Sequence, residues 1–122
     1  MLRTVDRAFA ALLILGAIGH TLGSIKAFIN TPHELLWALC ASVLIALLGV
    51  LNLLRSWRPQ DAALAWIVCA GTACWHVASI AFGLIIGKPF DPRVIVFVVL
   101  SVGLIVFGLN TALNGNPVHA KA

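Results

Sequence analysis

Four long apolar segments constrain this chain more than any other feature of its sequence. They cover residues 8–29, 35–54, 62–87 and 94–113, and none of them contains an acidic residue. About 20 apolar residues in a helix are enough to cross the ~30 Å hydrocarbon core of a bilayer. Inside lipid, a helix satisfies the backbone polar groups within its own segment. The segments therefore predict an all-α bundle of four transmembrane helices, which forms a single membrane domain over residues 1–122.

The composition points to lipid as the main solvent of this domain. Hydrophobic residues make up 61% of the chain and charged residues 10%, whereas soluble domains average roughly 45–50% and 25%. The net charge is +4, but the basic residues are dispersed at the ends of the apolar segments. That distribution is typical of interfacial anchoring, and it differs from the basic stripe of a nucleic-acid-binding protein. We expect a lipid bilayer as the main partner, no nucleic acid, and either a homo-oligomer or a larger membrane complex.

Lysine and arginine residues flank the segments unequally, which predicts an orientation. One side carries Arg3, Arg7, Arg55, Arg58 and Lys121, and the other carries Lys26, Lys88 and Arg93. Cytoplasmic loops are enriched in these residues. The bias predicts that both termini lie in the cytoplasm. We expect a multi-pass protein of a bacterial inner membrane.

The first segment also resembles a secretory signal peptide. Arg3 and Arg7 precede an apolar stretch with the small-residue sequence Ala17-Ile18-Gly19, which is the order of features in such a peptide. The apolar character continues to Ile29, however, and this favours a membrane span.

The two halves of the chain resemble each other. At an offset of 56 residues, Gly16, Ala17, His20, Gly23 and Ala27 align with Thr72, Ala73, His76, Ser79 and Gly83. At an offset of 59 residues, Ser42-Val43 aligns with Ser101-Val102 and Gly49 aligns with Gly108. The pattern predicts a helical hairpin used twice, with the copies related by a pseudo-two-fold axis along the membrane normal.

Two histidines, His20 and His76, fall within the first and third segments. The small and weakly polar residues that share their helix faces predict that these faces pack inside the bundle. An ionisable residue at membrane depth is a candidate functional residue. The predicted interior face comprises Gly16, Gly23, Ser24, Thr72, Ser79 and Gly83.

Several roles for the two histidines stay open. They could be the axial ligands of a haem b held between the first and third helices. They could bind copper or zinc, although no third ligand is evident and we assign no metal site. They could carry protons, because the pKa of an unperturbed imidazole is about 6.5. Finally, they could be structural and hydrogen-bond to neighbouring hydroxyl or carbonyl groups.

The sequence Gly19-His20-Thr21-Leu22-Gly23 in a first membrane helix resembles a group of uncharacterised bacterial four-helix membrane proteins. This resemblance implies the fold and no particular activity. The stretch Gly87-Lys88-Pro89-Phe90-Asp91-Pro92, followed by a glycine-containing helix, is similar to the small multidrug resistance transporters. That family depends on a membrane-embedded glutamate in its first helix, whereas this chain has Gly16 at the aligned position.

These observations lead to two hypotheses about function. The first is a non-enzymatic accessory or ligand-binding membrane protein, with His20 and His76 as the tentative cofactor ligands. The alternative is a small dimeric transporter, because the interior of one four-helix bundle is too narrow for a substrate path.

Overall fold

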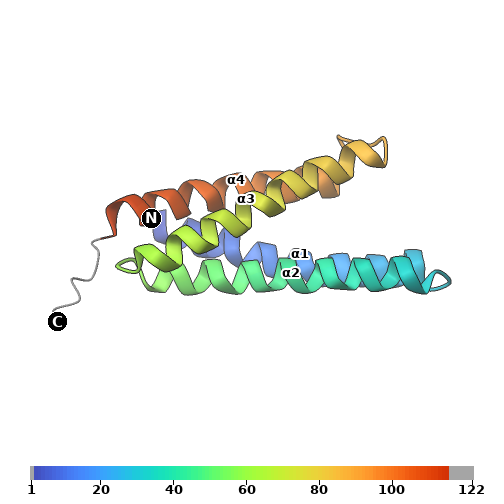
Figure 1. Cartoon of the computed structure of the whole chain (residues 1–122), viewed down its shortest axis with the longest axis horizontal. Helices are drawn as coiled ribbons and strands as arrows, with labels where there is room; N and C mark the ends of the chain where they lie inside the picture. Colours follow the sequence, from blue (N-terminus) through green and yellow to red (C-terminus); the bar gives the residue numbers. More distant parts are fainter. Residues whose placement is uncertain (1, 116–122) are drawn as a thin grey trace.

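The computed structural model describes residues 2–115 as four helices (Figure 1). They are α1 (Leu2–Phe28), α2 (Pro32–Trp57), α3 (Ala62–Ile85) and α4 (Pro92–Asn114). All four are long and apolar enough to cross a membrane, which confirms the all-α class and the four spans. Lys121, which entered the predicted orientation, lies outside the described residues.

The helices extend beyond the apolar segments at the end of the bundle that carries the N-terminus. α1 begins at Leu2, so Arg3, Asp6 and Arg7 belong to the helix, and α2 continues to Trp57, so Arg55 does as well. Hydropathy marks only the part of a helix that lies in hydrocarbon. The backbone hydrogen bonds continue through polar residues until a helix-breaking residue follows, here Pro59.

Local signals fix the start of α3 and the loop that joins α3 to α4. Asp61 accepts a hydrogen bond from the Leu64 amide at 2.9 Å, which caps the start of α3. At the end of α3, Gly87 has φ +66°, and the Lys88 amide donates to the Gly83 carbonyl at 2.9 Å. This is the geometry of a Schellman motif, in which glycine takes the left-handed position without strain. Asp91 then caps α4 by accepting from the Arg93 amide at 2.9 Å.

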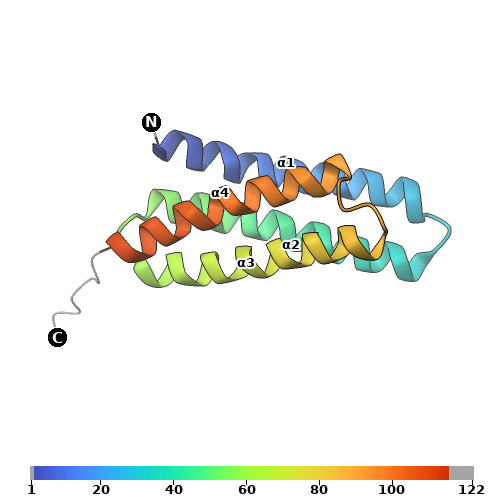
Figure 2. The same cartoon turned by 90° about the horizontal axis from the view of Figure 1, so that it is seen from above.

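The bundle consists of two antiparallel hairpins, α1–α2 and α3–α4. α1 packs on α4 and α2 packs on α3, whereas no residue pair of α1 and α3 has Cα atoms within 8 Å. Figure 2 shows α1 and α3 on opposite sides of the bundle, with α2 and α4 between them. In Figure 1, the hairpins lie close together near the chain termini and diverge toward the 29–31 and 86–91 loops. The buried members of the core come from α1, α2 and α4, and they are Ala10, Leu13, Ala17, Ile45, Leu48, Leu100 and Leu104.

Large apolar side chains cover the outside of the bundle. Ile85 is 83% exposed and Ile67 is 68% exposed, and such side chains need an apolar surrounding. The inside of each hairpin uses small residues instead. A Cβ atom on Gly49 would lie 2.5 Å from the Ile14 side chain and 3.1 Å from the Ala10 carbonyl oxygen, so this glycine allows α1 and α2 to approach closely.

We predict that Gly49→Ala destabilises the α1–α2 hairpin. The added methyl group would meet the backbone of α1, and overpacking of this kind costs about 1–3 kcal/mol. Thermal unfolding of the purified protein in detergent measures the effect. Gly19→Ala is the matched control, because a Cβ atom there has nothing within 4 Å. Equal melting temperatures for the two variants would contradict the close approach of α1 and α2.

Candidate functional site

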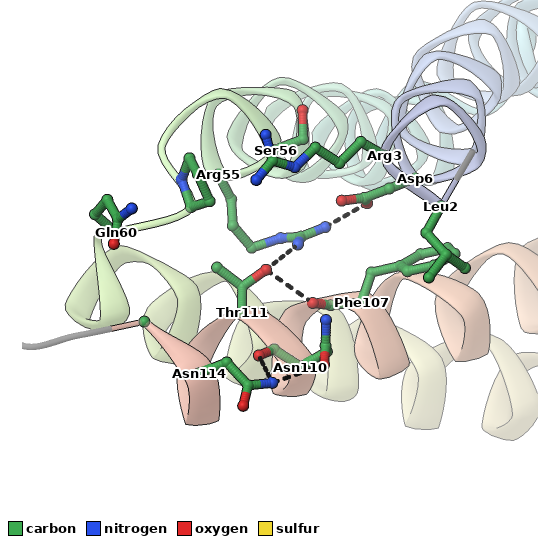
Figure 3. A pocket seen from close by; sticks show the side chains of 12 residues that line it. Leu2, Arg3, Asp6, Arg55, Ser56, Gln60, Phe107, Asn110, Thr111 and Asn114 are labelled. Carbon is green, nitrogen blue, oxygen red and sulfur yellow. Dashed lines mark hydrogen bonds and ion pairs between the residues drawn. The ribbon is translucent and has the colours of Figure 1, made fainter.

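A buried ion pair joins α1 to α2 where the hairpins are closest. Arg55 is fully buried, and its Nη2 donates to Asp6 Oδ1 at 2.5 Å; the Asp6 side chain is 8% exposed. Arg55 Nη1 also donates to the Thr111 hydroxyl of α4 at 3.0 Å, as Figure 3 shows. Buried charges are tolerated when they are paired and hydrogen-bonded in this way.

Asn52 extends the ion pair into a network that reaches every helix. Its Oδ1 accepts from Arg55 Nη2 at 3.3 Å, and its Nδ2 donates to the Thr72 hydroxyl of α3 at 3.1 Å. Thr72 in turn donates to the Val68 carbonyl at 2.8 Å. Asn52 and Thr72 are fully buried. The network of Asp6, Asn52, Arg55, Thr72 and Thr111 therefore ties the two hairpins together.

Sequence reasoning missed most of this network. It treated Arg55 as an interfacial anchor and gave Asp6 no role, because both residues fall outside the apolar segments. The signal was nevertheless present. The start of the first helix and the end of the second meet at the same side of an antiparallel hairpin, and they carry opposite charges. Thr72 was predicted to lie inside the bundle, and the structure places it there.

His20 and His76 each bond to the neighbouring helix of their own hairpin. His20 Nδ1 lies 2.8 Å from Ser42 Oγ, and His76 Nδ1 lies 2.8 Å from Ser101 Oγ. The structure does not join the two histidines directly. Both imidazoles are half-buried, and each ties one hairpin together.

The serine hydroxyl beside each imidazole also contacts a backbone carbonyl of its own helix. Ser42 Oγ donates to the Ala38 carbonyl at 3.1 Å, and Ser101 Oγ donates to the Val98 carbonyl at 3.0 Å. A hydroxyl group has one proton to donate. A serine that donates to its carbonyl accepts from the histidine, and the imidazole then carries its proton on Nδ1 and a lone pair on Nε2. Ser24 Oγ also lies 3.4 Å from His20 Nδ1. Within residues 2–115, neither Nε2 atom has a hydrogen-bond partner.

Aromatic rings fill the space between the hairpins beside His20. The Phe97 ring of α4 packs edge-on against His20, with ring centroids 6.4 Å apart, and against Trp75, with centroids 5.8 Å apart. Gly16 makes room for this ring, since a Cβ atom there would lie 2.9 Å from Phe97 Cε1. In the described part of the chain, Trp75 Nε1 is the one buried side-chain nitrogen or oxygen atom without a hydrogen-bond partner.

The predicted interior face is largely inside, with one difference. Ser24, Ser79 and Gly83 are buried, and a Cβ atom on Gly83 would lie 3.1 Å from the Val94 side chain of α4. Gly23 instead lies exposed on α1, and a Cβ atom there would have nothing within 4 Å. No neighbouring helix therefore covers Gly23 closely.

The predicted duplication agrees with the structure at some aligned positions only. The histidine–serine bonds occur at equivalent positions, and Gly49 and Gly108 each abut the first helix of their own hairpin. The aligned residues Gly23 and Ser79 differ, since one is exposed and the other buried. The duplicated hairpin therefore stays a prediction.

Comparison with protein-family models, with curated proteins and with solved structures gave no significant match. Among residues 2–115, no group of three or more histidine, cysteine, aspartate or glutamate side chains is placed to hold a metal ion. The function is therefore argued from the chemistry of the polar residues inside the bundle.

We predict that Asp6→Asn strongly destabilises the protein. The substitution leaves the Arg55 guanidinium buried without a counter-charge, and breaking a buried pair costs about 3–5 kcal/mol. The free energy of unfolding in detergent measures this effect. Arg7→Gln is the control, because Arg7 is exposed on the same helix.

The double variant Asp6→Leu with Arg55→Met should recover much of the stability. Replacing both charges by apolar groups leaves no unpaired buried ion. If Asp6→Asn were as stable as the Arg7→Gln control, the ion pair would not be what holds the hairpins together.

Proposed function

We propose that this four-span membrane protein is a non-enzymatic, ligand-binding accessory protein. The Nε2 atoms of His20 and His76 hold its ligand as electron-pair donors. One observation carries this proposal. Each imidazole is held at Nδ1 by a serine hydroxyl, and its Nε2 has no hydrogen-bond partner among the described residues. A hydrogen bond from the second ring nitrogen is the arrangement that orients histidines for ligation.

The indole of Trp75 supports a ligand in the same region. Its N–H group is buried without an acceptor, and such groups are rare in folded proteins because each one is costly. Trp75 and His20 both pack edge-on against the Phe97 ring. A ligand that displaces this ring would meet an electron-pair donor on α1 and a hydrogen-bond donor on α3.

Haem b is the cofactor that matches this donor set most directly. Neutral imidazole suits iron, and two histidines from different helices supply two axial ligands. His20 and His76 lie on α1 and α3, the helices that do not touch each other, so a group held by both would sit between the hairpins. Movement of Phe97 would be needed to admit it.

Proton-coupled export of the small multidrug resistance type receives no comparable support. That mechanism needs a carboxyl group in the first helix that is free to exchange protons with substrate. The acidic residue of α1 is Asp6, whose carboxylate is held by Arg55.

The proposed setting is a bacterial inner membrane with both termini in the cytoplasm. Arg55 is buried and paired, so the anchoring charges at that end of the described chain are Arg3, Arg7 and Arg58. These side chains are exposed where anionic headgroups would lie. A reporter enzyme fused to the C-terminus of the full chain tests this orientation.

The absorption spectrum of the purified full-length protein, before and after addition of haemin, tests the proposed function. We predict a Soret band that is lost in His20→Ala and in His76→Ala. His33→Ala is the matched control and keeps the band, because His33 is exposed and accepts a hydrogen bond from Trp37 at 3.2 Å.

Ser42→Ala separates ligation from a purely structural role. It keeps the imidazole of His20 but removes its orienting partner, and such changes weaken ligand affinity by about 10–100-fold. A protein without bound chromophore or metal, in which all these variants behave like the wild type toward haemin, would leave the histidines as structural hydrogen-bonding residues.

A further inference from the structure

A second polar feature of the bundle lies apart from the histidines. At the end that carries the N-terminus, a pocket of about 250 Å³ opens between the start of α1, the α2–α3 loop and the last turns of α4 (Figure 3). The residues that give it chemical character are Arg3, Asp6, Arg55, Gln60, Asn110 and Asn114.

The charged groups of this pocket leave one positive charge without a partner. Asp6 and Arg55 neutralise each other through their ion pair. Arg3 is exposed at the mouth of the pocket, and within residues 2–115 it makes no ion pair or side-chain hydrogen bond. The pocket therefore carries a net charge of one unit from Arg3. Because Asp6 Oδ1 already accepts from Arg55, its carboxylate repels an entering anion less than a free one would.

Amide groups add uncharged donors to this site. Asn114 Nδ2 donates to Asn110 Oδ1 at 2.8 Å, which orients the Asn110 amide. The Nδ2 group of Asn110 has no partner among the described residues. The same holds for Nε2 of Gln60, which the α2–α3 loop supplies. Arg3, Asn110 and Gln60 together offer a guanidinium group and two amide donors, which is a donor set that suits an oxyanion.

The position and size of the pocket limit the class of ligand that it can bind. The lining residues come from the helix ends, beyond the apolar segments, where lipid phosphates lie. The volume is below the ~300–1,000 Å³ of typical pockets for drug-sized ligands. A single phosphate-bearing headgroup is of the right class, whereas a nucleotide or a peptide is too large.

We propose that this pocket binds one phosphate group at the membrane surface, with Arg3 as its charge partner and with Asn110 and Gln60 as donors. Arg55 is a positioning residue, since it is fully buried and holds Asp6 and Thr111 in the pocket floor. The phosphate belongs to a lipid headgroup or to free inorganic phosphate, which share this chemistry. The proposal does not depend on the histidines.

The test uses the full-length protein in a neutral detergent, titrated with short-chain phosphatidic acid and, separately, with inorganic phosphate. Arg3→Gln should weaken the binding of the phosphate-bearing probe about tenfold or more, because a hydrogen bond to a charged group contributes about 1.5–3 kcal/mol. Arg7→Gln is the matched control. It removes the same charge from an exposed position on the same helix outside the pocket, so its Kd should stay close to that of the wild type.

Further variants make the result specific. Arg3→Lys should recover part of the affinity, since it keeps the charge but loses the planar pair of donors. His20→Ala and His76→Ala should leave phosphate binding unchanged, which separates this site from the proposed histidine ligand. Competition by inorganic phosphate would identify the free ion as the ligand, and binding of phosphatidic acid alone would identify the lipid. Equal affinities for Arg3→Gln and Arg7→Gln, or no binding of either probe, would overturn the proposal.

Discussion

The ion pair between Asp6 and Arg55 is the interaction on which the packing of this bundle depends, because a guanidinium that is fully buried in the protein needs a counter-charge. Arg55 reaches across to Thr111 of α4, and Asn52 beside it reaches Thr72 of α3. Among the described residues, these are the side-chain hydrogen bonds that cross from one hairpin to the other. A single layer of polar contacts therefore sets how the α1–α2 and α3–α4 hairpins meet. It also explains why they lie closest near the chain termini (Figure 1).

The histidine–serine bonds lie at a different depth from the ion pair, and they connect helices within a hairpin. Each connects the two helices of one hairpin and leaves the relation between hairpins to apolar packing around Phe97. The half of the bundle beyond these bonds has no polar contact between hairpins in the described chain, and there the hairpins diverge. A ligand bound between the hairpins, as proposed, would displace apolar packing and leave the ion pair in place.

The two polar centres also differ in the chemistry that they offer. At the histidines, Nδ1 contacts a serine and Nε2 has no partner among the described residues, and the ligand proposed there is an electron-pair acceptor such as a metal centre. At the end of the bundle, the free groups are N–H donors and one guanidinium, so an oxyanion is the matching ligand. The two proposed sites, one at the histidines and one at the end of the bundle, would therefore bind ligands of different chemistry. The two sites share no residue.

The sequence by itself determined the four spans, because about 20 apolar residues in lipid have no alternative to a helix. It also determined that His20 and His76 are ionisable groups at membrane depth. Only the tertiary structure decided which groups meet. Hydropathy marks a residue as polar without giving its partner, so Arg55 was interpreted as an interfacial charge and Asp6 was given no role until the helices were placed side by side. Gly23 and Ser79 look equivalent in the sequence alignment, but Gly23 is exposed and Ser79 is buried, because burial depends on what the neighbouring helices place against each position.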